Sequence, residues 1–143
     1  MSSAELNNLV KIGKLKHELA SAHEQKGLLA SAVARLADSE REILSYESRF
    51  DLAYNAAHAL ALYALRRLGY RSDNRYIVFQ CLPHTAGLPP EVWRVLAKAH
   101  ERRNLIEYEG RLEHDERLLT DVIAAATKLH AVIEAMPPEP ETQ

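Results

Sequence analysis

A run of apolar residues at helical spacing is the feature that most limits how this chain can fold. The members of the run recur every three or four positions and therefore share one helix face: Phe50, Ala53, Ala57, Leu60, Ala61, Ala64 and Leu68. The alanines are short enough to let a neighbouring helix approach closely. Gly69 follows, where glycine commonly ends a helix in a left-handed conformation. The pattern predicts one long helix over 47–68.

Weaker patterns of the same kind predict helices in the rest of the chain. They cover 3–20, 22–43, 90–109 and about 115–135, with a short helix that Ser72 caps and that stops near Pro83. The apolar run 76–82 would be buried in a helical fold or would seat a second subunit. Only five glycines occur in 143 residues, which favours helices. We therefore expect one all-α domain over 1–136 and a disordered tail over 137–143.

Charge and cysteine content narrow the classes of protein to which the chain can belong. The formal net charge is −2, so nucleic-acid binding would require a local basic patch. A single cysteine, Cys81, excludes an internal disulfide and a cysteine-based zinc site. No apolar run reaches the length of a membrane span, and the N-terminus lacks the apolar core of a signal peptide. We expect a cytoplasmic protein without membrane contact.

Common catalytic and cofactor motifs are missing from the sequence. Seven histidines occur, but no pair shows the spacing of a helical metal site. There is no glycine-rich phosphate loop and no Gly-x-Ser-x-Gly nucleophile motif. We therefore expect neither a metal nor a cofactor.

An arginine occupies an unexpected position in the helix predicted over 90–109. On a helical wheel the inner face of this helix is defined by Val92, Leu96, Ala99 and Ile106. Arg103 lies almost at the centre of that face, where an unpaired buried charge would be very costly. Two explanations stay open. The side chain pairs across the bundle with a carboxylate such as Glu107 or Asp51, or it faces a wet cleft or a subunit interface.

Polar residues surround Arg103 and also line the helix predicted over 47–68. His100 and Glu107 flank Arg103, and Asn104 and Tyr108 lie further round the same side. A second stripe, at i, i+3, i+4 and i+7, is formed by Asp51, Tyr54, Asn55 and His58. This stripe is either an ordinary solvated face or the opposite wall of a cleft that contains Arg103.

The segments SRFDLAYNAAHALALYALRRLGYRSDNRYIVFQCLPHT and AHERRNLIEYEG resemble the HEPN family, the higher-eukaryote and prokaryote nucleotide-binding domain. The similarity covers about residues 5–135. It implies an antiparallel bundle of four to five helices with a short connecting helix, usually as a homodimer. Many members are metal-independent ribonucleases or toxin partners, and others act in phage defence.

The family motif consists of an arginine, a polar residue, about three variable residues and a histidine. Arg103 and Asn104 match its first two positions, and Tyr108 stands where the histidine would be. In ribonuclease members the histidine handles a proton and the arginine offsets phosphate charge. Tyrosine is a poor general base at neutral pH, but it donates hydrogen bonds and stacks on bases. His100 and His58 are alternative proton acceptors.

The resemblance implies an RNA-acting protein, with Arg103, Asn104 and Tyr108 as catalytic candidates for a metal-independent endoribonuclease of a toxin–antitoxin or phage-defence system. The alternatives are a non-catalytic nucleotide-binding or protein-interaction dimer, and a structural dimer with Arg103 as a buried ionic lock. Expected partners are a second copy, RNA or a nucleotide, and a cognate antitoxin or other protein. The candidate substrate-binding residues are Arg102, His100, Glu107, Asp51, Tyr54, Asn55 and His58.

Overall fold

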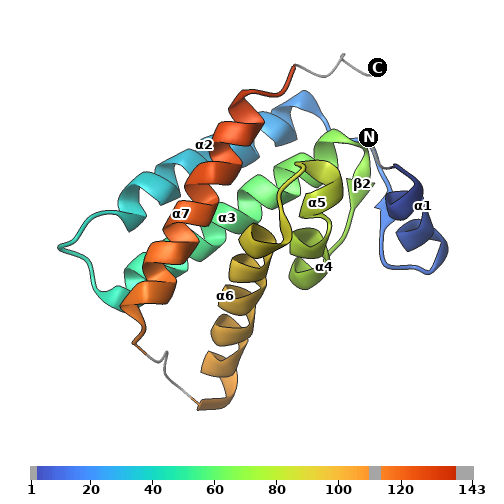
Figure 1. Cartoon of the computed structure of the whole chain (residues 1–143). Coiled ribbons are helices and arrows are strands. Elements are labelled where there is room, and N and C mark those ends of the chain that lie inside the picture. Colours follow the sequence, from blue (N-terminus) through green and yellow to red (C-terminus); the bar gives the residue numbers. More distant parts are fainter. Residues whose placement is uncertain (1–2, 110–113, 138–143) are drawn as a thin grey trace.

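The computed structural model describes residues 3–109 and 114–137, without the side chains of Ser3 and of residues 106–109. Four long helices dominate this part of the chain (Figure 1): α2 (Ala22–Ser39), α3 (Tyr46–Arg67), α6 (Pro90–Glu109) and α7 (Glu116–Glu134). Three shorter helices complete it: α1 (Ser3–Lys11), α4 (Arg75–Gln80) and α5 (Leu82–Thr85). The predicted all-α bundle is confirmed. Gly110 and most of the predicted tail lie outside the described residues.

Helix α3 is the centre of the bundle and makes its most extensive contacts with α2 and α7. Its alanine-rich face explains this position, because Ala53, Ala57, Ala61 and Ala64 are fully buried, as predicted. Figure 1 shows α3 running between its neighbours. The predicted helix end is also confirmed. The helix ends at Arg67, Leu68 is the cap residue, and Gly69 then adopts a φ of 87°.

The short helices differ from the sequence-based expectation in detail. Two helices, α4 and α5, replace the single predicted one, and the side chain of Asn74 rather than Ser72 caps α4 by accepting the backbone N–H of Ile77. The apolar run 76–82 is buried within the chain except for Tyr76 and Gln80. Most of the run therefore belongs to the hydrophobic core of the chain and is not exposed for contact with a second subunit.

The helix predicted over 3–20 is too long, because α1 ends at Lys11 and Gly13 adopts a φ of 80°. The chain continues as strand β1 (Lys16–His17), which pairs antiparallel with strand β2 (Tyr70–Arg71). Leu6 and Leu15 are buried, so this N-terminal segment packs against the rest of the protein. A pair of two-residue strands has no periodicity, which is why the sequence pattern did not reveal it.

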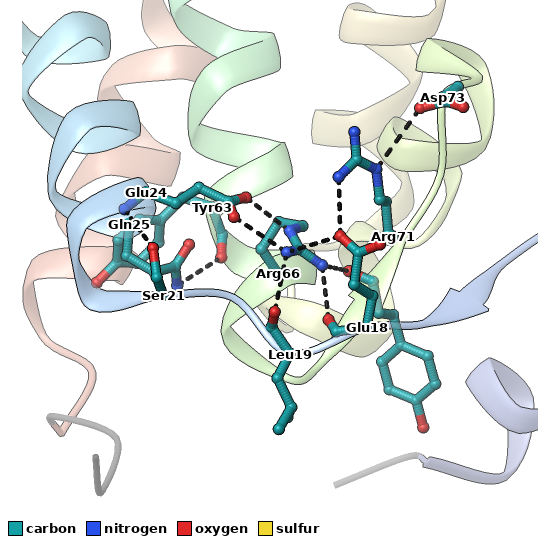
Figure 2. Close-up of polar contacts among 10 residues, drawn as sticks. Glu18, Leu19, Ser21, Glu24, Gln25, Tyr63, Arg66, Arg71 and Asp73 are labelled. Atoms are coloured by element: carbon teal, nitrogen blue, oxygen red, sulfur yellow. Dashed lines mark hydrogen bonds and ion pairs between the residues drawn. The ribbon is translucent and has the colours of Figure 1, made fainter. Parts of the chain in front are cut away.

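A buried arginine at the end of α3 anchors the N-terminal segment (Figure 2). Arg66 is only 3% exposed, and its Nε and Nη2 donate to the two carboxylate oxygens of Glu24, at 2.7 and 3.0 Å. Further donations reach three backbone carbonyls, those of Glu18, Leu19 and Tyr70. The Glu18 carboxylate also lies 3.2 Å from Nη2. All five guanidinium N–H groups therefore have partners, as burial of this group requires.

Replacing Arg66 with methionine should lower the free energy of unfolding by roughly 3 kcal/mol, measured by urea denaturation. The cost lies at the low end for a broken buried pair, because Glu18 and Glu24 remain partly hydrated. Arg35→Met is the matched control, since Arg35 is exposed on α2 and hydrogen-bonds only Ser31 among the described residues. Equal stability of the two variants would contradict the anchoring role.

The Arg66–Glu24 contact should also make stability depend on pH. The hydrogen bond from Arg66 lowers the pKa of Glu24 from its ordinary value. A lowered folded-state pKa means that the contribution is complete above the unfolded value of about 4.3 and is lost as pH falls through the folded value. Glu24→Gln should therefore be less stable than wild type at neutral pH and should converge with it in acid. A difference that is constant with pH would refute this linkage.

Candidate functional site

The two polar stripes of the sequence meet where α3, α4 and α6 pack together. The hydroxyl of Tyr54 on α3 lies 2.9 Å from Nδ1 of His100 on α6. Half-exposed Asp51 accepts a hydrogen bond from Nε of Arg103 at 3.0 Å. The stripe on α3 is thus not an isolated solvated face, because it contacts the polar side of α6.

Arg103 pairs across the bundle with Asp51, one of the two carboxylates named from the sequence, but the pair is partly exposed and not buried. Its side chain is 38% exposed, whereas Ala99, one turn earlier on the same face, is fully buried. The wheel gives the direction of a side chain but not whether a neighbour lies at that height, and α6 extends beyond α4 in Figure 1. The exposed pair with Asp51 contributes about 0–1 kcal/mol, so Arg103 is not a buried ionic lock.

The described residues use only a small part of the hydrogen-bonding capacity of Arg103. Among the described residues its one polar partner is Asp51, which engages Nε. The two terminal nitrogens of the guanidinium are the atoms that form a bidentate fork on carboxylate or phosphate groups. The position of Arg103 therefore leaves a forked donor available to an anion from solution.

His100 is held by two side chains and has a perturbed acidity. Asn104 Nδ2 lies 3.2 Å from Nε2 of His100, and the Tyr54 hydroxyl is hydrogen-bonded to Nδ1 of the same ring. If Asn104 donates to Nε2, the neutral ring carries its proton on Nδ1 and donates it to Tyr54. Burial and then the charge of Arg75 lower the pKa of His100 below its ordinary value. The imidazole is therefore neutral at neutral pH and has a lone pair that can accept a proton.

Sequence reasoning missed Arg75, the first residue of α4. Its Nη1 donates to Asn55 Oδ1 at 2.9 Å, and its guanidinium carbon lies 5.4 Å from the centre of the Tyr54 ring. Asn55 Nδ2 in turn donates to the backbone carbonyl of Asp51. This hydrogen bond orients the Asn55 amide so that its oxygen faces Arg75. No carboxylate pairs with Arg75 among the described residues. Arg75 stands alone before an apolar run, so no helical pattern of polar residues marked it. The only signal in the sequence was its position directly after Asn74, the residue that caps α4.

His58 belongs to the inner part of the same group. Its ring meets Phe79 edge-on, with 5.9 Å between ring centres. Burial, followed by repulsion from Arg75 and His100, lowers the pKa of His58 to about 4. The ring is therefore neutral and a weak base at neutral pH, which makes His100 the better proton acceptor of the two.

Three of the predicted site residues are not placed in this group. Arg102 lies apart from this group, because its Nη1 is 3.6 Å from Oδ2 of Asp115, the residue that caps α7. The side chains of Glu107 and Tyr108 lie outside the described residues. The residues brought together, called here the α3–α4–α6 cluster, are Asp51, Tyr54, Asn55, His58, Arg75, His100, Arg103 and Asn104.

The α3–α4–α6 cluster carries a local positive charge on a chain with net charge −2. Arg75 and Arg103 outnumber the single carboxylate of Asp51, and both histidines are neutral because their pKa values are lowered. Among the described side chains the cluster therefore has one positive charge in excess, which favours anions over cations at this place.

A groove of about 250 Å³ lies elsewhere, between α6 and α7, and contains no residue of the cluster. Its charged walls carry cations and anions in equal number, among them Arg94 and Lys98 against Glu91 and Asp121. Opposite charges at such spacing offset each other, so the groove does not attract one sign of ligand as the cluster does.

Comparison with known proteins gives no match to a family model, a curated protein or a solved structure. Within residues 3–109 and 114–137, no group of three or more His, Cys, Asp or Glu side chains could hold a metal ion. In the same part of the chain, no helix is both long and apolar enough to cross a membrane. Function must therefore be inferred from the cluster itself.

Proposed function

We propose that the α3–α4–α6 cluster binds the phosphate backbone of RNA, and that the chain is a HEPN-like RNA-acting protein. The observation that carries the proposal is the pair of arginines beside a neutral imidazole. Arg75 reaches Asn55 with one terminal nitrogen and also hydrogen-bonds the Tyr54 side chain, whereas Arg103 reaches Asp51 with Nε, so the described residues leave the terminal N–H donors of Arg103 unused. Guanidinium groups of this kind are strong phosphate ligands.

The same geometry contains the groups needed for metal-independent cleavage, but it favours binding. In cleavage His100 would take the proton of a ribose 2′-hydroxyl, whose oxygen bonds to the adjacent phosphorus to form a 2′,3′-cyclic phosphate as the P–O5′ bond breaks; the departing 5′-oxygen would take a proton from water. Arg103 would offset the charge on the phosphate oxygens. In the chain alone, however, Asn104 and Tyr54 occupy both ring nitrogens of His100. Cleavage therefore requires Asn104 to release Nε2, whereas phosphate binding requires no such change.

The proposal includes the homodimer that the resemblance implies, in which two clusters would face one RNA strand. The alternative is a module that holds a nucleotide or a partner protein without cleavage. It is supported by the same two ring hydrogen bonds on His100 and by tyrosine at position 108 in place of the family histidine.

Binding of a fluorescein-labelled single-stranded RNA, measured by anisotropy in EDTA over a series of salt concentrations, tests the proposal. Arg103→Ala should weaken binding about tenfold, because one charge-assisted contact is lost. The slope of log affinity against log salt should fall by about 0.7 for each phosphate contact removed. The fold should be retained, since the Asp51 pair is exposed.

Arg35→Ala is the charge-matched control, because Arg35 is exposed on α2 outside the cluster. Equal affinity of wild type and Arg103→Ala would overturn the proposal. The same reactions separate cleavage from binding. Cleavage that His100→Ala abolishes would establish the ribonuclease, and binding that depends on Arg103 without cleavage would establish the non-catalytic alternative.

A further inference from the structure

We propose that the ring of Tyr76 is a stacking platform for an unpaired nucleobase, which makes single-stranded RNA the ligand of the α3–α4–α6 cluster. This inference rests on the proposed function and adds a subsite to it. Tyr76 is the second residue of α4, directly after Arg75, and it is not among the eight residues that define the cluster.

Tyr76 is exposed in a segment that is otherwise mostly buried. Its side chain is 41% exposed, whereas the next three residues, Ile77, Val78 and Phe79, belong to the core. Among the described residues, the other exposed large hydrophobic side chains are aliphatic. An exposed tyrosine is ordinary in itself, so the case depends on what lies next to this ring.

Two rings on α6 hold the Tyr76 ring beside the cluster. Trp93 meets it edge-on, with 6.5 Å between ring centres and an interplanar angle of 76°. The ring centre of His100 lies 6.3 Å from that of Tyr76, at an interplanar angle of 42°. Trp93 and His100 are seven residues apart and therefore share one face of α6. Contacts of this type orient the exposed ring and restrict its motion.

The Tyr76 ring and Arg75 lie beside the same imidazole, and Arg103 follows His100 by three residues on α6. Arg75 is close enough to His100 to lower its pKa, and Tyr76 contacts the same ring. A phosphate held by the guanidinium groups would place the attached nucleotide close to Tyr76. Bases of single-stranded RNA are free to stack on aromatic rings, whereas bases in a duplex are hidden and duplex RNA is recognised by shape and backbone.

Trp93 provides a direct readout, because it is the one tryptophan of the sequence and it contacts Tyr76. The probes are a single-stranded oligouridylate, an abasic ribose-phosphate strand of the same length and a duplex RNA. The oligouridylate should change the fluorescence of Trp93, and the abasic strand should not.

Tyr76→Leu, which keeps apolar volume but lacks a flat ring, should weaken oligouridylate binding about tenfold. Tyr76→Phe should bind like wild type.

Electrostatic contacts should be unaffected by these changes. Tyr76→Leu should keep the wild-type salt slope and the wild-type affinity for the abasic strand and the duplex, because no charge is removed. Arg103→Ala, in contrast, should weaken binding of all three probes.

The results distinguish failure of the stacking platform from failure of the proposed RNA binding. Binding that needs Arg103 but is equal in wild type and Tyr76→Leu, or equal for oligouridylate and the abasic strand, would overturn the platform and leave the proposed function standing. No binding of any probe to the wild type would overturn both. If Tyr76→Leu fails to fold by circular dichroism, the comparison of oligouridylate with the abasic strand on wild type decides the question alone.

Discussion

The packing of α3 within the bundle is the constraint on which the other features depend. One face of this helix carries alanines that are buried against α2 and α7, and the adjoining face carries Asp51, Tyr54, Asn55 and His58. Because both faces belong to one rigid helix, burial of the first fixes the direction of the second. The polar face therefore meets α4 and α6 at a defined height, where the hydroxyl of Tyr54 reaches His100.

Arginines in two environments show how the chain separates stability from recognition. Arg66 is buried and uses all five of its N–H donors on Glu24 and on backbone carbonyls. Arg103 and Arg75 are partly exposed. Arg103 hydrogen-bonds Asp51, and Arg75 hydrogen-bonds Asn55 and Tyr54. A satisfied buried arginine holds segments together, whereas a partly unsatisfied one at the surface can bind an anion.

Local patterns predicted the helices well, and seven of the eight residues of the cluster lie on the two polar stripes that those patterns indicated; only Arg75 was missed. The stripe of α3 and the polar side of α6 were readable because their residues repeat at helical spacing. The β1–β2 pair and the partners of Arg66 were not, since Glu18 and Glu24 lie more than 40 residues away in the sequence. Arg103 was predicted on the correct face, but its exposure depends on where neighbouring helices end, and no local pattern contains that information.

The central claim is that an RNA phosphate binds beside the imidazole of His100, and the ring nitrogens report this most directly. Nitrogen-15 NMR of the histidine side chains during titration with single-stranded RNA would follow His100, with His130 on α7 as an internal reference. We expect the ring-nitrogen resonances of His100 to shift as the phosphate charge comes to lie beside the imidazole, while those of His130 stay unchanged. Saturating RNA that leaves both nitrogens of His100 unshifted would contradict the claim.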